Sequence, residues 1–266
     1  MDIRKISKVF EYTKPRKLGN KLLILATAPE VKPFFEDESI RKRFEDYDIA
    51  VINRMPLCSE AEMHLIKPKY IVFSDSVFYD DHLENGDINE RKILVEQVLG
   101  RVDWECNVVV PVWASYSIDN SFIHYIKLSI LNLDYNVLTR PLYNRNLANF
   151  GFNNVVMGAI YFGITFGYRD IAIMGFTYRN GEMYMDEDGL HTSSYPHYYD
   201  ECTYPEVVGY DKLFDGKESY LLKRAKRAVE SEYKLCELAR YAHDMGVDVV
   251  NYTPRNCVDV FRTERL

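Results

Sequence analysis

Paired cysteines and long apolar runs are both missing from this sequence of 266 residues. Its five cysteines are widely spaced, and none belongs to a C-x-x-C pair of the kind that zinc sites and redox motifs use. A disulfide framework is therefore not indicated, and a reducing, cytoplasmic compartment fits best. No run of about 18 apolar residues occurs, so no membrane-spanning helix is expected. The first residues, Met1–Lys5, also lack the apolar stretch of a signal peptide.

An excess of positive charge is missing as well. Lysine and arginine number 33 against 40 aspartates and glutamates, which gives a net charge of −7 at pH 7. A general nucleic-acid binder would show a basic surface, so no nucleic-acid partner is expected, although one local anion site is compatible with this balance. Tryptophan is scarce at 2 residues, whereas tyrosine reaches 21. We expect most of these phenols in or near the core, because tyrosine is commonly half-buried.

What the sequence does contain is a series of short apolar runs, and the first three of them stop at a small polar residue. Such runs are typical of strands buried on both faces, and they cover 21–26, 48–53, 70–75, 107–112, 170–175 and 247–252. Between them, helical patterns are expected near 29–35 and over 88–100, 154–167 and 217–245. The alternation predicts an α/β fold, a single Rossmann-like domain over residues 1–266 with a mostly parallel central sheet flanked by helices.

Ligands of such sheets bind outside the carboxyl ends of the strands, which singles out polar residues at the strand ends. The first strand ends in a small turn at Thr27 and Ala28, where backbone N–H groups can approach a phosphate. This turn is neither a G-x-G-x-x-G motif nor a P-loop. Asn53 and Asp75 follow later strands and can hydrogen-bond a base or ribose hydroxyls, but a turn or cap is the simpler role for each.

The helix expected over 154–167 begins at Asn153 and Asn154. Free N–H groups and the helix dipole favour an anion at such a start, although simple N-capping by asparagine explains the same residues. Gly158 and Gly163 are expected to let this helix pack closely. Gly175 ends the strand that follows and opens the richest loop of the chain.

That loop carries two phenols, Tyr178 and Tyr184, and the guanidinium of Arg179. Phenol and guanidinium groups can stabilise a developing phosphate charge without a metal. The dipeptide at 180–181, Asn-Gly, also predicts a β-hairpin turn, which can itself carry the phenols. The stretch 180–216 has no clear period, and we interpret it as a long lid-like loop insertion, because irregular segments of this length are usually functional or disordered.

Two histidines of this lid region, His191 and His197, are candidates for a general base. We prefer His197, because tyrosines flank it on both sides. Asp186 and Asp188 have the D-x-D spacing of carboxylates that hold a divalent cation, but a solvated acidic loop is the better interpretation, so no metal site is assigned. The helix over 217–245 has a basic face that is either solvated or docks on an anionic membrane.

The segment from Gly158 to Tyr184 resembles the bacterial sialyltransferases of the Campylobacter type, and more loosely other bacterial transferases that use CMP-activated acidic sugars. The resemblance implies that Tyr178 and Tyr184 bind the departing CMP phosphate. The strand and turn over 22–29 look like the nucleotide-binding start of that family, and Asn53 matches an asparagine after its second strand.

Three positions depart from the family pattern. The first turn has Thr27 between two alanines where the family is glycine-rich with an asparagine, and Ser74 stands where a second nucleotide-contacting asparagine is expected. Glu201 falls where the family has its catalytic histidine. The base is therefore His197, His191 or a carboxylate such as Glu201.

The resemblance implies a metal-independent glycosyltransferase that moves a sialic-acid-like or Kdo-like sugar from a CMP donor to a saccharide or glycolipid acceptor, in surface polysaccharide or lipooligosaccharide synthesis. The CMP-sugar is a substrate, so no cofactor is expected. The alternatives are a metal-dependent enzyme that uses a nucleoside-diphosphate sugar, a non-catalytic carbohydrate-binding or assembly protein, and a pyrophosphokinase on a related fold. A peripheral contact with the inner face of the membrane and a homo-oligomer stay open.

Overall fold

The structure, a computed structural model, describes residues 17–79, 86–114, 116, 118–129, 131–177, 183–193, 205–214 and 216–266. Within these ranges the chain forms a large sheet of eight strands in the order β11-β10-β6-β1-β2-β3-β4-β5, and every neighbouring pair is parallel. The predicted α/β fold is therefore confirmed. The strands of this sheet are β1 (Lys21–Leu25), β2 (Asp48–Ile52), β3 (Tyr70–Val72), β4 (Cys106–Pro111), β5 (Ile123–Leu128), β6 (Asp170–Met174), β10 (Asp248–Asn251) and β11 (Arg262–Thr263).

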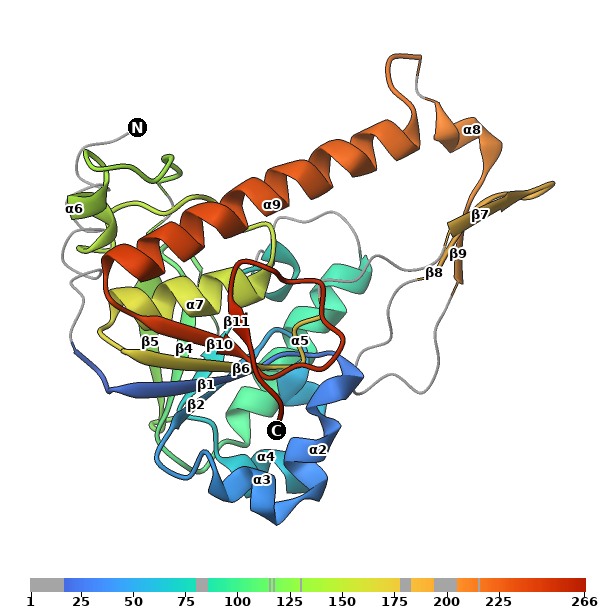
Figure 1. Cartoon of the computed structure of the whole chain (residues 1–266). Helices are drawn as coiled ribbons and strands as arrows, with labels where there is room; N and C mark the ends of the chain where they lie inside the picture. The colour runs from blue at the N-terminus through green and yellow to red at the C-terminus, as the bar shows by residue number, and fades with distance from the viewer. Residues whose placement is uncertain are drawn as a thin grey trace.

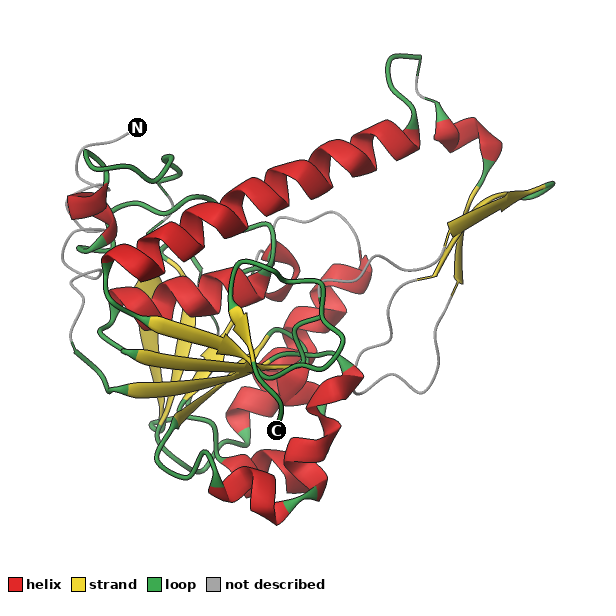
Figure 2. Ribbon diagram, viewed as in Figure 1, coloured by secondary structure: helices red, strands yellow, loops and turns green. Residues whose placement is uncertain are grey.

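Helices cover both faces of the sheet, with α7 and α9 on one face and α2, α4 and α5 on the other (Figures 1 and 2). The helices are α2 (Lys32–Glu36), α3 (Glu38–Lys42), α4 (Glu60–Ile66), α5 (Gly86–Gly100), α6 (Arg140–Tyr143), α7 (Val155–Thr165), α8 (Tyr210–Leu213) and α9 (Tyr220–Asp244). Short 3₁₀ turns lie at Pro29–Val31, Met55–Leu57 and Ser76–Phe78.

The apolar runs form central strands because each strand has to fill two cores. In β1, Leu22 and Ile24 belong to the core under α7 and α9, while Leu23 and Leu25 belong to the core against α2 and α4. All four side chains are fully buried. A strand with a core on both faces needs apolar residues at every position, which explains the unbroken run.

Helix α7 packs against the sheet, and all eleven of its residues are buried. A Cβ on Gly163 would come within 2.8 Å of Ile171 Cδ1 and 2.9 Å of Leu22 Cδ2, so a larger residue here would require these two side chains to shift. Gly158, by contrast, makes ordinary contact with Phe152, so the close packing expected at both glycines occurs at Gly163. The helix closes at Gly167, which has φ +94°.

Seven of the 21 tyrosines are buried in the described chain, so phenols contribute to the core. They include Tyr143, Tyr161 and Tyr241, whose ring centroids lie 5.4 to 6.0 Å from one another. The phenol of Tyr161 donates to the carbonyl of Ala148 at 2.7 Å. The seven are Tyr70, Tyr79, Tyr135, Tyr143, Tyr161, Tyr168 and Tyr241.

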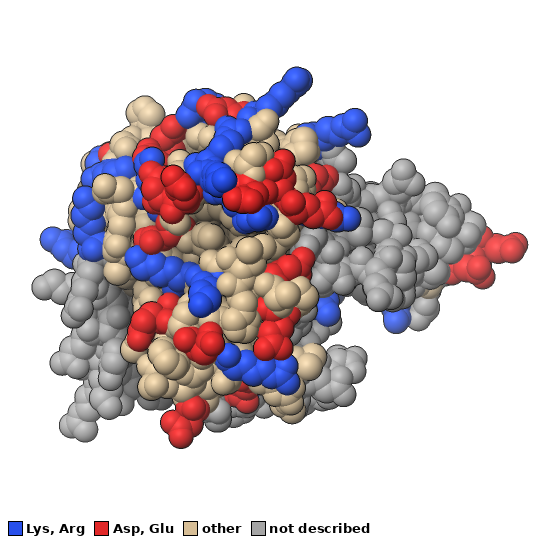
Figure 3. Space-filling view, turned by 90° about the horizontal axis from the view of Figure 1, so that it is seen from below, with Lys and Arg blue, Asp and Glu red and all other residues tan. Residues whose placement is uncertain are grey.

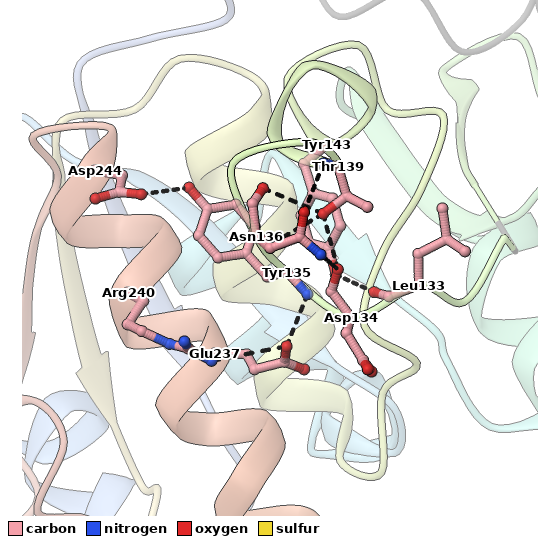
Figure 4. A network of polar contacts seen from close by, with 9 residues as sticks. All are labelled: Leu133, Asp134, Tyr135, Asn136, Thr139, Tyr143, Glu237, Arg240 and Asp244. Carbon is pink, nitrogen blue, oxygen red and sulfur yellow. Dashed lines mark hydrogen bonds and ion pairs between the residues drawn. The ribbon is translucent and has the colours of Figure 1, made fainter.

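The loop before α6 is held to α9 by polar contacts (Figure 4). The backbone N–H of Tyr135 donates to Glu237 Oε1 at 2.7 Å, and the Tyr135 phenol donates to Asp244 Oδ2 at 2.8 Å. Glu237 is only 1% exposed. Burial, with the nearby charge of Asp134, raises the pKa of Glu237 above its ordinary value of 4.5, although the bond from Tyr135 opposes this shift.

The lid region differs from its sequence interpretation. Instead of a loop, the described part forms a three-stranded antiparallel sheet of β7 (Met183–Asp186), β8 (Gly189–Ser193) and β9 (Pro205–Val208), followed by α8. Strands of four or five residues rich in polar side chains show too little alternation to be recognised. The hairpin turns at Glu187 and Asp188, whereas residues 180–181, where the sequence predicted a turn, lie outside the described ranges.

Charges of both signs alternate on the face shown in Figure 3, and no large area of it carries a single sign. Lysine, arginine and carboxylate side chains lie side by side at several places on this face, with uncharged residues between them. In the described part of the chain, no helix is both long enough and apolar enough to cross a membrane.

The carboxyl ends of β1 and β6 meet at Gly175, which has φ +78°. The Ala26 N–H donates to the Met174 carbonyl at 2.7 Å, and the Ala28 N–H donates to the Gly175 carbonyl at 3.1 Å. A Cβ on Gly175 would lie 2.8 Å from the Ala26 carbonyl oxygen. Glycine is therefore required twice, by the backbone conformation and by the contact with the first turn.

We expect Gly175→Ala to be more destabilising than Gly246→Ala. Gly246 also has positive φ (+64°), but a Cβ there would meet nothing within 4 Å. Each variant carries the cost of a left-handed alanine, about 1–2 kcal/mol, and only Gly175→Ala adds a clash with backbone. Denaturant unfolding of the two variants measures the difference. Equal losses would show that the β1 turn moves freely away from β6.

We expect Glu237→Gln to gain stability relative to wild type as the pH rises from acid to neutral. A raised carboxyl pKa means that the folded state holds the proton more tightly, so wild type loses stability as the pH rises above the ordinary value of 4.5. Glutamine does not titrate and escapes this loss. The measurement is the free energy of unfolding of both proteins over that pH range.

Glu230→Gln on the same helix is the matched control, with the opposite sign. Its hydrogen bond with Lys234 lowers the pKa of Glu230, so the stability that this carboxylate contributes is present at neutral pH and lost on acidification. The glutamine variant should therefore fall below wild type at neutral pH and approach it in acid. The same trend with pH in both variants would contradict the assignment.

Candidate functional site

A cleft of about 710 Å³ opens at the carboxyl ends of the central strands. Its base is formed where β1, β2, β3 and β6 end, one side is the start of α7, and another is α9. The residues expected at the strand ends therefore come together in space. Those that line the cleft are Thr27, Ala28, Asn53, Asp75, Asn153, Asn154 and Gly175.

Asn53 and Asp75 form a pair across the ends of β2 and β3. Asn53 Nδ2 donates to Asp75 Oδ2 at 2.5 Å. The backbone of Asn53 has φ +42°, a left-handed conformation that asparagine tolerates better than most residues. Its N–H continues the ladder to the Val72 carbonyl at 2.9 Å, while Oδ1 is buried without a hydrogen-bond partner among the described residues. The pair offers a carboxylate and an amide oxygen in a cleft that is otherwise rich in donors.

The two asparagines before α7 both have structural partners. Asn154 is the N-cap, and its Oδ1 accepts the Val156 N–H at 2.8 Å. Asn153 joins α7 to α9, because its Nδ2 donates to Ser231 Oγ at 3.2 Å and its Oδ1 accepts from Lys234 Nζ at 3.0 Å. Capping is therefore real, and it also fixes the start of α7 beside the cleft.

Two buried polar side chains hold the segment after β6 through hydrogen bonds to its backbone. Asn251 Nδ2 donates to the Phe176 carbonyl at 3.0 Å, and the Phe176 N–H donates to Thr253 Oγ1 at 3.0 Å. Asn251 and Thr253 are both fully buried. The Thr177 carbonyl accepts from the Cys257 N–H at 2.8 Å. The chain from Gly175 to Thr177 is thus rigidly positioned directly before Tyr178.

The side of the cleft formed by α9 was not expected as part of the site. Arg224, Arg227, Ser231 and Glu232 line it, together with Ala228. Burial, and secondarily the charge of Asp259, raises the pKa of Glu232. The sequence signal was present, since residues 224, 227, 228 and 231 follow helical spacing and so share one face. Composition had suggested only a solvated or membrane-docking face.

Ser74 lies elsewhere. It lines a neighbouring cavity of about 230 Å³ with Tyr79 and the exposed ring of Trp113. The Tyr79 phenol donates to the Ser74 carbonyl at 2.9 Å. The structure therefore places Ser74 beside, and not among, the described residues that line the main cleft.

The candidate catalytic residues are only partly covered by the described residues. Tyr178, Arg179, His197 and Glu201 lie outside the described residues. Tyr184 and His191 are placed through the backbone, where Tyr184 on β7 pairs directly with His191 on β8. Two candidates seven residues apart are thus neighbours in a hairpin, which the sequence interpretation as a loop did not predict.

The D-x-D motif flanks the tip of the same hairpin. Asp186 ends β7 and pairs with Gly189, and Asp188 is exposed in the turn. Within the ranges that the structure describes, no group of three or more histidine, cysteine, aspartate or glutamate side chains is arranged to hold a metal ion.

Comparison with known proteins gives matches to solved structures only. No protein-family model matches the chain, and no curated protein matches it. It is similar to a variant of the sialyltransferase CstII in complex with CMP, with 12% identity, a TM-score of 0.46, and coverage of 92% of this chain and 85% of that chain. CstII from Campylobacter jejuni with the substrate analogue cytidine-5′-monophosphate matches with 13% identity and a TM-score of 0.43, over 92% of this chain and 85% of that chain. Another CstII variant, described as an α-2,3/8-sialyltransferase, matches with 13% identity and a TM-score of 0.41, over 91% of this chain and 86% of that chain.

Proposed function

We propose that this chain is a glycosyltransferase that moves an acidic sugar, sialic-acid-like or Kdo-like, from a CMP-activated donor to a saccharide or glycolipid acceptor. The observation that carries the proposal is the cleft at the carboxyl ends of β1, β2, β3 and β6, where Thr27, Asn53 and Asp75 meet. Its volume of about 710 Å³ is within the range of about 300–1,000 Å³ typical of small-molecule sites. The sequence resemblance to CMP-sugar transferases supports the choice of donor.

The nucleoside end of the donor is assigned to the Asn53–Asp75 pair. A carboxylate accepts hydrogen bonds from ribose hydroxyls, and the Asn53 oxygen accepts from an exocyclic amine such as that of cytosine. The small turn at Thr27 and Ala28 leaves room for the sugar–phosphate end. The short 2.5 Å bond between Asn53 and Asp75 orients both side chains before the ligand arrives.

The leaving phosphate is assigned to Tyr178 and Tyr184, as the resemblance implies, with Arg179 beside them. In the reaction the bond between the sugar and the phosphate oxygen breaks, the acceptor oxygen bonds to the same sugar carbon, and CMP departs. Negative charge grows on the phosphate, and phenol donors aimed at it lower the barrier. The rigid segment from Gly175 to Thr177, anchored by Asn251 and Thr253, supports this role because it leads directly into Tyr178.

The acceptor hydroxyl has to lose its proton as it attacks. We assign this proton to His197, with His191 and Glu201 as the other candidates, since imidazole and carboxylate groups serve as general bases. His191 stays a candidate because it pairs with Tyr184, which is assigned to the leaving phosphate, on the small sheet.

The lid region, residues 180–216, is proposed to close over the bound donor and exclude water, because hydrolysis competes with transfer. Its small sheet and α8 lie at the N-terminal end of α9, the helix whose flank lines the cleft (Figure 1). A closing element in this position would cover the donor from the side opposite the strands.

A thermal-shift comparison of nucleotides tests the donor assignment. We expect CMP to raise the melting temperature, and CDP, UDP, GDP and ATP to raise it less. A ligand at about 100 times its Kd stabilises the folded state by about 2.7 kcal/mol, which corresponds to several degrees. Stabilisation should persist in EDTA.

Other outcomes select the alternatives. A shift by UDP or GDP that requires a divalent metal would favour a nucleoside-diphosphate-sugar enzyme. A shift by ATP with magnesium would favour a pyrophosphokinase. No shift by any nucleotide, with binding to saccharides retained, would favour a non-catalytic carbohydrate-binding protein.

The phosphate assignment is tested by Tyr178→Phe combined with Tyr184→Phe. Removing donors to a developing charge should lower kcat by about 10²–10³-fold or more, while the fold stays intact. Tyr233→Phe, an exposed position on α9, is the control and should keep wild-type turnover. Normal turnover of CMP-sialic acid in the double variant would remove both phenols from the mechanism.

A further inference from the structure

Helix α9 changes character along one of its faces. Over its C-terminal half this face is apolar and buried in the core, through Leu235, Leu238 and Ala242. Ser231 continues the face at the rim of the core. One and two turns further toward the N-terminus, the same helical spacing brings Arg227 and Arg224 over the cleft. The inward face of the helix therefore carries leucines where it packs on the core and arginines where it lines the cleft.

The other basic residues of this stretch behave differently. Lys226 is paired with Glu218, and neither Lys223 nor Lys226 is among the residues that line the cleft. Within the described ranges, no ion pair joins Arg224 or Arg227 to a carboxylate. Two guanidinium groups therefore face a cleft without a carboxylate partner in the described chain, in a protein with a net charge of −7.

A second source of positive potential faces the same space. The first residues of α7, Val155 and Val156, line the cleft together with the N-cap Asn154. The Val156 and Met157 N–H groups donate to the side chain and the carbonyl of Asn154, and the dipole of the helix adds a partial positive charge at this end. Asn153 ties the two elements together through Ser231 and Lys234. Helix start and arginine face are thus held at fixed positions on one cleft.

Two carboxylates among the described residues line the cleft, Asp75 and Glu232, and neither neutralises the positive charge of the arginines and of the start of α7. Asp75 lies after the end of β3, where it accepts a hydrogen bond from Asn53. Glu232 follows Ser231 on α9, and burial raises its pKa, which disfavours its charged form. The part of the cleft between α7 and the arginines therefore keeps an excess of donors.

We propose that Arg224 and Arg227, facing the start of α7, bind an oxyanion of the donor, either its phosphate or the carboxylate of its sugar. This inference rests on the proposed function for the identity of the donor. Guanidinium groups bind both oxyanions through paired N–H donors, which explains arginine at these two positions. The face that composition assigned to solvent or membrane then belongs to the active cleft.

The test compares Arg224→Gln/Arg227→Gln with Lys223→Gln/Lys226→Gln by calorimetry. Both double variants remove two positive charges from the same turn of α9, but only the first changes the cleft. We expect the arginine variant to bind CMP about 10- to 100-fold more weakly than wild type if the oxyanion is the phosphate, with cytidine binding unchanged. If it is the carboxylate, CMP binding stays normal and the KM for CMP-sialic acid rises instead. The lysine variant should match wild type in every case.

The inference and the proposed function can fail separately. Wild type that does not bind CMP, but is stabilised by inorganic pyrophosphate only while the arginines are present, would keep the oxyanion site and overturn the donor. CMP binding with no effect of the arginine variant on CMP or CMP-sialic acid would overturn the inference alone. Equal losses for cytidine and CMP, or equal effects of the arginine and lysine variants, would also overturn it. Arg224→Lys/Arg227→Lys should restore part of the lost affinity.

Discussion

The parallel direction of all eight strands is the constraint on which the rest of the structure depends. Because every strand ends at the same edge, polar residues from distant parts of the chain meet there, and Asn53 comes to bond with Asp75. At Gly175 the end of β6 touches the turn after β1. That contact forms the base of the cleft. Asn251 and Thr253 hold the next residue, Phe176, through hydrogen bonds to its backbone.

Helix α9 connects stability to the proposed chemistry. Its C-terminal half buries Leu235 and Leu238 and receives the loop before α6 through Glu237. Its N-terminal half overhangs the cleft with Arg224 and Arg227. A rigid helix of 25 residues transmits the position of the core to the arginines, since a side chain anchored in this way keeps its place better than one on a loop.

Much of this arrangement was predictable from the sequence, for physical reasons that also explain the failures. The central strands have a core on each face, so continuous apolar runs marked β1, β2, β3 and β6. The edge strand β5, Ile123–Leu128, mixes histidine and lysine with apolar residues and was missed. The strands of the lid region were missed because they are short and polar. The pairing of Tyr184 with His191 depends on that hairpin, so spacing alone could not show it.

The sequence by itself determined the central strands and their alternation with helices, and with it the edge of the sheet where Thr27, Asn53, Asp75 and Gly175 meet, because parallel strands have their carboxyl ends in common. It also contained the helical spacing of the two arginines. Only the tertiary structure decided that this face of α9 turns toward the cleft, and that Ser74 opens into a neighbouring cavity. Helix orientation depends on packing between residues far apart in the chain, such as Asn153 with Ser231, and local patterns carry no information about such contacts.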